Sequence, residues 1–246
     1  MARYRPRPAW TLAVEDGRLV FSGGADEVYV TDESDDATVL QMREQWENGA
    51  LDPDSLSADG RVLVEQLLAA GVLDGLPAGE RSFRVLWVGN ELPDLASRLR
   101  EFSARRGMTV NPAAAFTLVV RTGGPQLDLA GLDLPGPHLL VDVAYHHTLS
   151  LGPLVVPPDT SCLGCLVGRI TSAWGDQPTP RRPAVCDEPE LAASLAVREV
   201  DAIQAGSLAL ANRTVAYDLR QHELLSSALF KLPWCPRCGE PAPVYR

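Results

Sequence analysis

Four of the five cysteines fall into two Cys-x-x-Cys pairs, Cys162 with Cys165 and Cys235 with Cys238. Together the two pairs offer four thiolates, which are the ligands of a tetrahedral zinc site. Because a closed four-cysteine shell leaves no position for substrate, the predicted zinc is structural. The alternative is a set of redox or adventitious pairs. A thioredoxin-like motif is a single pair, however, and a reducing cytosol favours metal over disulfides.

The fifth cysteine, Cys186, lies in the proline-rich segment 177–189 with Arg181 and Arg182. Nearby arginines lower the pKa of a thiol, so one hypothesis is a catalytic or thioester-forming cysteine. The other hypothesis, which the residues favour, is a spare cysteine in an exposed loop.

The segment that follows the predicted strand Phe83–Val88 lacks a phosphate-binding loop. A nucleotide-binding domain of the expected type follows its first strand with a glycine-rich turn. Here Gly89 is the only glycine, and Glu91 and Asp94 place negative charge where phosphates would lie. We therefore expect no ATP site.

Composition limits the classes of protein and partner. The chain has 246 residues, of which 46% are hydrophobic, enough for one large domain or two small ones with a core. A net charge of -10 argues against a phosphate-tracking protein, so we expect no nucleic acid. The apolar runs are shorter than the roughly 20 residues of a membrane helix, and the basic N-terminus lacks the apolar stretch of a secretory signal. We expect a cytoplasmic protein without a membrane partner.

The pattern of residues 1–78 predicts a winged helix-turn-helix-like module. Asp16-Gly17 between two apolar runs is a strong hairpin signal. A third strand is expected at Glu27–Thr31, before helical periodicity begins. The expected strands are 10–14, 18–22 and 27–31, and the expected helices are 38–46, a short one near 52–53, and 60–70, which Gly71 and Gly75 end.

Residues 79–246 alternate strands and helices, which predicts an α/β domain, so that the chain is α+β overall. The segment 76–82 is the expected linker. The expected strands are 83–88, 116–121, 138–143 and 152–156, with helices at 92–106 and 190–212 and a closing hairpin of strands 214–219 and 224–232.

The strand Glu27–Thr31 has two interpretations that the residues leave open. It could accept a peptide as an added strand beside the helix 60–70, or it could be an ordinary solvated edge. A winged module can also read DNA with a helix. Because Arg61 is the only basic residue of that helix, and Asp59 and Glu65 lie on or beside it, the charge favours peptide over DNA.

The run Leu151–Cys165, the alanine-rich helix and the segment Pro233–Cys238 resemble the ThiF-like, ubiquitin-activating-enzyme-like fold. The resemblance extends to its degenerate branch, the Ocin-ThiF-like leader-peptide-binding partners of YcaO cyclodehydratases. The order of the N-terminal elements resembles a RiPP recognition element.

The resemblance implies a non-catalytic protein of ribosomal peptide natural-product biosynthesis, such as that of bacteriocins or thiopeptides. It would bind the leader of a precursor peptide and deliver it to a separate YcaO enzyme, which uses ATP to form thiazoline or oxazoline rings. The resemblance is also consistent with a homodimer. By position, the implied peptide-binding residues are Val28, Tyr29, Val30, Arg61, Val64 and Leu68, and replacing Tyr29 by proline is expected to remove backbone pairing to the leader.

Two other functions stay open at this point. The chain could be an ATP-dependent adenylating enzyme with Cys186 as its thioester-forming residue, which requires a nucleotide site. It could also be a zinc-containing transcription regulator, which requires salt-sensitive DNA binding.

Overall fold

The computed structural model describes residues 3–7, 9–24, 27–32, 34–76, 81–145, 147–180, 182–183 and 187–238. Contacts divide the chain into two compact units, Met1–Gly79 and Glu80–Arg246. None of the helices in these described ranges is long and apolar enough to cross a membrane.

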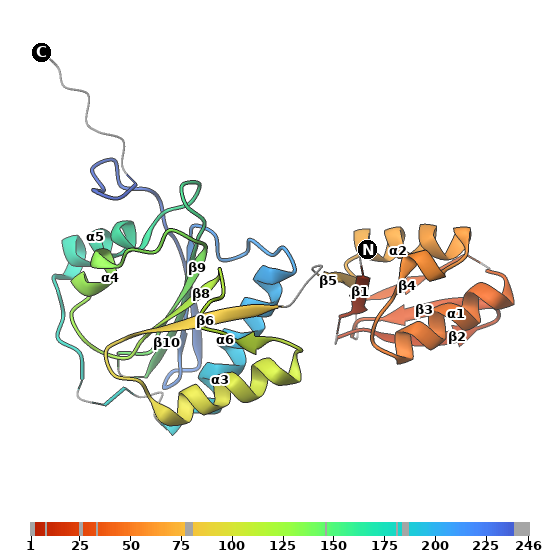
Figure 1. The fold of residues 1–246 in the computed structure, drawn as a ribbon, viewed down its shortest axis with the longest axis horizontal. Coiled ribbons are helices and arrows are strands. Elements are labelled where there is room, and N and C mark those ends of the chain that lie inside the picture. The colour runs from red at the N-terminus through yellow and green to blue at the C-terminus, as the bar shows by residue number, and fades with distance from the viewer. Residues whose placement is uncertain are drawn as a thin grey trace, which may run out of the picture. The chain divides into compact units, whose positions relative to one another are not determined.

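The first unit contains a three-stranded antiparallel sheet in the order β2-β3-β4 (Figure 1). The predicted hairpin between β2 and β3 is confirmed, since Asp16 and Gly17 form its turn with φ values of 48° and 74°. Both residues must adopt positive φ in such a two-residue turn, which Asp-Gly tolerates. The strands are β2 (Thr11–Glu15), β3 (Arg18–Ser22) and β4 (Val28–Val30).

Two capped helices follow the sheet. The Asp35 carboxylate accepts a hydrogen bond from the Thr38 N–H at 2.9 Å at the start of α1 (Asp36–Glu47). After the short helix η1 (Pro53–Ser55), the Ser57 hydroxyl accepts one from the Gly60 N–H at 3.0 Å and begins α2 (Ala58–Ala69). These side chains satisfy N–H groups that the first turn of a helix leaves without partners.

A second small sheet, which the sequence analysis missed, joins the two ends of this unit. β1 (Arg3–Pro6) pairs antiparallel with β5 (Leu73–Leu76). The predicted helix stop at Gly75 is therefore wrong, because Gly75 lies within β5 opposite Tyr4. The core between the sheets and the helices is apolar; its fully buried members include Leu19, Phe21, Met42, Leu51 and Leu67.

The second unit is the predicted α/β structure, built on a seven-stranded mixed sheet in the order β12-β11-β10-β9-β8-β6-β7. The strands from β6 to β9 are parallel, and β10, β11 and β12 continue the sheet antiparallel. Their bounds are β6 (Ser82–Val88), β7 (Thr109–Val110), β8 (Thr117–Arg121), β9 (His138–Asp142), β10 (Thr148–Val155), β11 (Arg213–Asp218) and β12 (Glu223–Ala228).

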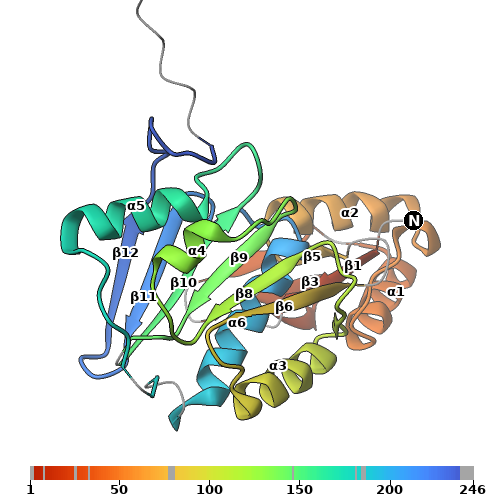
Figure 2. The ribbon, with the colours of Figure 1, turned by 60° about the vertical axis from the view of Figure 1, so that its left-hand side comes forward.

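Helices cover both faces of this sheet (Figure 2). α3 (Pro93–Arg105) and α6 (Pro189–Gln204) pack on one face through an apolar core. α4 (Leu127–Gly131) and α5 (Leu163–Trp174) pack on the other through a smaller core.

The alanine-rich helix is shorter than predicted. It ends at Gln204 rather than at residue 212, and Gly206, with φ at 99°, turns the chain away. The helix α5, which the sequence analysis did not predict, begins at the first Cys-x-x-Cys pair.

A buried carboxylate ties α3 to α6. Asp201, only 2% exposed, accepts a hydrogen bond from Arg106 at 2.9 Å and another from Arg81. Removing one partner of a buried ion pair leaves the other charges buried and without compensation.

We expect Asp201→Ala to lower the free energy of unfolding by about 3–5 kcal/mol, because two arginines lose their shared carboxylate. Urea denaturation measures the change. The control is Asp133→Ala, since Asp133 is 97% exposed and 3.7 Å from Arg237, and its effect should stay within about 0.5 kcal/mol. An Asp201→Ala variant as stable as the parent chain would contradict the assignment.

Candidate functional site

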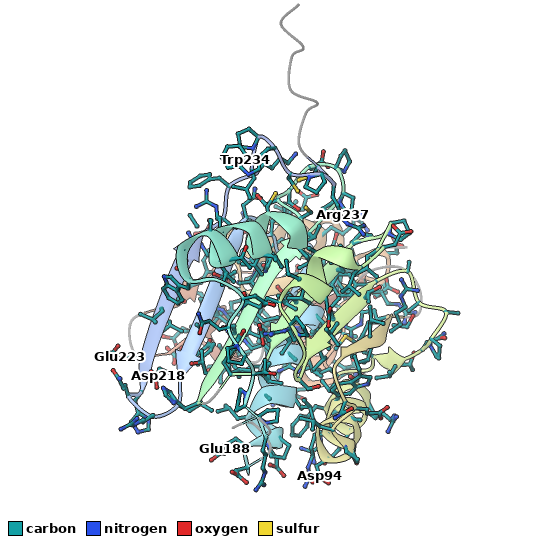
Figure 3. The ribbon with its side chains drawn as sticks, turned by 90° about the vertical axis from the view of Figure 1, so that its left-hand side faces the viewer. Asp94, Glu188, Asp218, Glu223, Trp234 and Arg237 are labelled. Atoms are coloured by element: carbon teal, nitrogen blue, oxygen red, sulfur yellow. The ribbon has the colours of Figure 1, made fainter. Side chains whose placement is uncertain are left out.

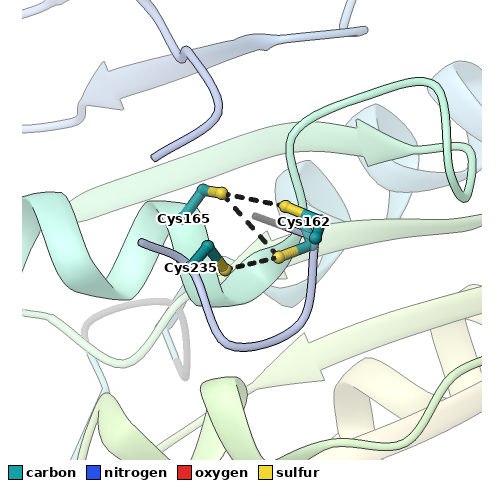
Figure 4. A group of neighbouring side chains, drawn as sticks. Cys162, Cys165 and Cys235 are labelled. Carbon is teal, nitrogen blue, oxygen red and sulfur yellow. Dashed lines mark hydrogen bonds between the residues drawn. The ribbon is translucent and has the colours of Figure 1, made fainter. Parts of the chain in front are cut away.

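The four cysteines of the two Cys-x-x-Cys pairs form one cluster (Figure 4). Cys162 is the N-cap of α5 and Cys165 lies in its first turn, while Cys235 and Cys238 follow β12 near the end of the described chain. All four Sγ atoms lie within 4.8 Å of one another. The closest approaches are 3.2 Å between Cys165 and Cys238, and 3.5 Å between Cys162 and Cys235.

The shape of the cluster fits a tetrahedral metal ion. Zinc–sulfur bonds of about 2.3 Å place the sulfur atoms about 3.8 Å apart, close to the observed spacing. Gly164 keeps the space between the pairs open, because a Cβ atom there would lie 3.3 Å from the Cys235 sulfur. The Leu232 N–H also donates to the Cys165 sulfur at 3.3 Å, which holds a thiolate in place. The cluster is therefore consistent with a zinc site.

The thiols differ in their readiness to ionise. Burial raises the pKa of Cys162 and that of Cys238. At Cys235 burial acts in the same direction, but hydrogen bonds from the backbone N–H groups of Arg237 and Cys238 lower the pKa to about 7. Four thiolates this close repel one another, so a divalent cation is needed to ionise all of them.

The loops that follow β6 and β8 pack closely against each other at the other end of the sheet. Gly89, with φ at 97°, follows β6 and packs so tightly that a Cβ atom would lie 2.7 Å from the Gly123 nitrogen. The Thr122 hydroxyl donates to the Asn90 carbonyl at 2.6 Å and joins the loops after β6 and β8. These loops flank the point where the strand order reverses, at which open α/β sheets bind their ligands.

The helix α3 begins at this end of the sheet. Asp94 lies in the first turn of α3, as expected, and no side chain caps that helix. Figure 3 places Asp94 at the opposite end of the unit from Trp234 and Arg237, which neighbour the cysteine cluster. The cluster and the loops after β6 and β8 are therefore at opposite ends of the sheet.

A buried ion pair lies next to the loops that follow β6 and β8. Arg121, which is fully buried, donates to Asp142 at 2.9 Å and to the Gly124 carbonyl at 2.7 Å. Its guanidinium also lies over the Tyr145 ring, 4.8 Å from the centroid. Burial raises the pKa of Asp142, while the attraction of Arg121 acts against that rise. The guanidinium of Arg121 is therefore held by hydrogen bonds and a ring contact within the protein.

In the first unit, the hydrogen-bond register makes β4 an edge with free backbone groups. The Gly23 N–H donates to the Glu27 carbonyl, and the Thr31 N–H donates to the Leu19 carbonyl. Because bonding alternates along an antiparallel strand, Tyr29 also bonds to β3, where it lies opposite Phe21. The N–H and C=O groups of Val28 and Val30 point away from the sheet, and no other described strand pairs with them.

The three predicted strand residues therefore divide into two roles. Val28 and Val30 are 61% and 50% exposed, on the face turned away from the core. Tyr29 points inward, and its hydroxyl reaches Gln66 of α2 at 3.4 Å.

The predicted helix residues do not lie on the flank of α2 that contacts β4. Val64 is 2% exposed and belongs to the core. At 3.6 residues per turn, Arg61, Val64 and Leu68 lie on the far flank of α2 from Gln66, the residue that contacts β4. Arg61 instead folds back and donates to the Leu56 carbonyl at 2.9 Å.

Sequence reasoning missed Gln66, the α2 residue that contacts β4, and the exposed valine one turn before it. Val62 lies one turn before Gln66 on the same flank and is 53% exposed. A period-3.6 count anchored on the buried positions would have identified it, because an exposed valine interrupts an otherwise polar flank. Cys186 and Arg181, singled out above, lie outside the described residues.

Comparison with known proteins gives structural matches only. No protein-family model and no curated protein sequence matches the chain. A heterocyclase solved in complex with substrate and cofactor is similar over 98% of this chain, with a TM-score of 0.64 and 17% identity. The heterocyclase TruD is similar over 97% of this chain, with a TM-score of 0.64 and 18% identity. E. coli MccB, solved with MccA, covers 97% of this chain and is itself covered completely, with a TM-score of 0.50 and 11% identity.

The two heterocyclases are much longer than this chain, which spans 40% and 43% of their lengths. At these identities the likeness establishes the fold. Over nearly its whole length, this chain has the fold found in part of heterocyclase TruD and, more distantly, in E. coli MccB, so the resemblance inferred from the sequence is confirmed at the level of the fold.

Proposed function

We propose that this chain is a non-catalytic partner protein that binds the leader of a precursor peptide and delivers it to a separate heterocyclase. The observation that carries the proposal is the free edge of β4 beside α2, where Val28 and Val30 direct unpaired backbone groups outward. An extended peptide can add to such an edge as a further strand. The Met1–Gly79 unit is then the winged recognition module.

The edge of β4 beside α2 suits an extended peptide whose side chains alternate between two faces. Backbone groups of the leader would pair with Val28 and Val30, which supplies affinity without requiring a particular sequence. Its side chains would alternate between the two faces of the extended sheet. One set would contact the exposed side chains of Val28 and Val30, and the other would lie against Tyr29, Val62 and Gln66. The second set would supply specificity.

The proposed function assigns the chemistry to a separate catalytic protein. The solved heterocyclases contain more than half of their length beyond the part that matches this chain. We propose that the ATP-dependent cyclodehydration of cysteine, serine or threonine residues belongs to a YcaO-type partner carrying that remaining part. The closed loops around Gly89 and Thr122, and the carboxylate of Asp94, support a chain that does not adenylate its peptide.

The cysteine cluster would hold a structural zinc ion in this protein. Zinc would join the start of α5 to the segment after β12, which are separated by about 70 residues in sequence. When bound, it would neutralise the four thiolates and fix that segment against the sheet.

The substitution Val30→Pro tests the proposed binding of the leader at the edge of β4. It should remove an outward N–H, so leader affinity falls at least about tenfold, the effect of one lost hydrogen bond or more. Fluorescence polarisation with the labelled leader of a precursor encoded beside this gene measures it. Tyr29→Pro is a poorer test than the sequence suggested, because the Tyr29 N–H bonds to β3 within the native sheet.

Two matched variants control this test. Val30→Ala keeps the N–H and should bind within a few-fold of the parent chain. Val14→Pro places proline on β2, the other edge of the same sheet, and should also leave binding intact. If Val30→Pro binds the leader as tightly as the parent chain, the proposed binding site at β4 is wrong. If neither the parent chain nor any variant binds the leader, the adenylating alternative is tested next. Its test is an assay for pyrophosphate exchange that depends on the C-terminus of the peptide.

The metal content of the purified protein tests the proposed zinc site. We expect purified protein to hold one zinc ion per chain, and Cys165→Ser to lose it, because the cluster then has three thiolates and Cys165 is fully buried. Loss of metal should also lower the unfolding temperature, since structural zinc is coupled to folding. Elemental analysis and thermal unfolding measure both effects, and Cys186→Ser should retain the metal. Parent protein free of stoichiometric zinc would contradict the assignment.

A further inference from the structure

A cavity of about 280 Å³ lies beside the cysteine cluster in the second unit. Cys162 and Cys238 line it on one side. It lies where β9 begins and β10 ends, at the pairing of His138 with Val155. Its apolar walls include Leu129, Leu132, Leu134 and Leu163. Sites for drug-sized ligands have volumes from about 300 Å³ upward, so this cavity suits one small and largely apolar group.

Lysine and arginine side chains bring positive charge to this cavity. The Lys231 ammonium donates to the Pro158 carbonyl at 2.6 Å, and its other two N–H groups have no partner among the described residues. Arg237 donates to the Ala130 and Gly131 carbonyls at 2.8 and 2.7 Å, which holds it at the end of α4. Both side chains line the cavity, and Lys231 retains free donors for a ligand.

His138 contributes a hydrogen-bond acceptor to the same cavity. The side chain lies at the start of β9, is 4% exposed and lines the cavity. Its Nδ1 atom lies 2.9 Å from the Gly136 carbonyl, and because a carbonyl only accepts, Nδ1 carries the proton. Burial lowers the pKa of the imidazole, so the ring is neutral and its Nε2 atom is an acceptor. No described residue donates to Nε2, and a buried acceptor without a donor is costly.

The charges around the cavity favour the binding of one anion. Four thiolates and one zinc ion in the cluster would carry two negative charges. Lys231 and Arg237 oppose them, together with Arg84, whose positive charge contributes to the lowered pKa of the imidazole. These cations therefore outnumber the charges of a filled zinc site by one. The acidic side chains on the neighbouring loops, Asp133 and Asp159, are exposed and do not line the cavity.

We propose that this cavity binds the C-terminal residue of a polypeptide whose last side chain is apolar. The terminal carboxylate would accept hydrogen bonds from Lys231, the backbone N–H of the same residue would donate to Nε2 of His138, and its side chain would contact the apolar walls. A free carboxylic acid lacks that N–H, and a residue inside a chain lacks the carboxylate. A C-terminal residue provides all three contacts. This proposal does not depend on leader binding at β4.

Small mimics of a peptide C-terminus test the proposal on the full chain. N-acetyl-leucine has the N–H, the carboxylate and the apolar side chain, whereas N-acetyl-leucinamide lacks the carboxylate and 4-methylpentanoate lacks the N–H. We expect N-acetyl-leucine to bind at least about tenfold more tightly than either, because each analogue loses one hydrogen-bonded contact. Titrations followed by the amide NMR shifts of Gly164 and Lys231 measure the three affinities.

Each unexpected result of these titrations would overturn part of the assignment. Equal binding of N-acetyl-leucinamide would show that the cations do not recognise a carboxylate. Equal binding of 4-methylpentanoate would show a site for free acids and not for a peptide C-terminus. If N-acetyl-leucine does not bind, the cavity is not a ligand site of this class.

The variant Lys231→Met places the contact at one side chain. It keeps an unbranched side chain without the charge, so N-acetyl-leucine should bind at least about tenfold more weakly, while zinc content and unfolding temperature stay those of the parent chain. Arg169→Met is the matched control, because Arg169 is exposed on α5, lies 5.4 Å from the centroid of the Phe230 ring and does not line the cavity. Unchanged affinity in Lys231→Met would contradict the proposal. The comparison of the three ligands uses only the parent chain, so it decides the question even if a variant loses its zinc.

Discussion

A β-strand directs alternate backbone groups to its two sides, and the proposed peptide site of this protein follows from that constraint. A strand at the end of a sheet satisfies only half of its N–H and C=O groups within the chain. β4 leaves those of Val28 and Val30 open. At this edge exposed apolar side chains adjoin the open groups, which is the combination that favours an added strand over solvent alone.

The second unit combines an α/β fold with closely packed loops after β6 and β8. Ligands of open α/β sheets bind where the strand order reverses, but here Gly89 packs on Gly123, and Thr122 joins the loops. The fully buried Arg121 is held by Asp142 and the Gly124 carbonyl. At the opposite end, the cysteine cluster fastens the segment after β12 to α5. The cluster and the packed loops thus lie at opposite ends of the sheet.

The sequence was most informative where chemistry or turn geometry restricts the residue type. Paired cysteines predicted the cluster, and Asp16-Gly17 predicted the hairpin. The pairing of β1 with β5 was missed because it joins segments about 70 residues apart, with no local signal.

The residues of the groove could be predicted only in part. The strand residues were placed correctly on β4, but their alternation depends on the register with β3, which the sequence does not specify. On α2 the rotation of the helix about its axis was not specified by the sequence. Val64 is in the core and Gln66 contacts Tyr29, because the packing of the helix on Phe21 and Leu19 decides which flank turns toward β4.

Residue-resolved amide hydrogen exchange, with and without the leader peptide, tests leader binding at β4 most directly. The outward amides of Val28 and Val30 should exchange much more slowly when the leader is bound, because they become donors to an added strand. The equivalent outward amides of Leu12 and Val14 on β2 should not change. A leader that binds and leaves Val28 and Val30 exchanging at the rate of the free protein would contradict the account.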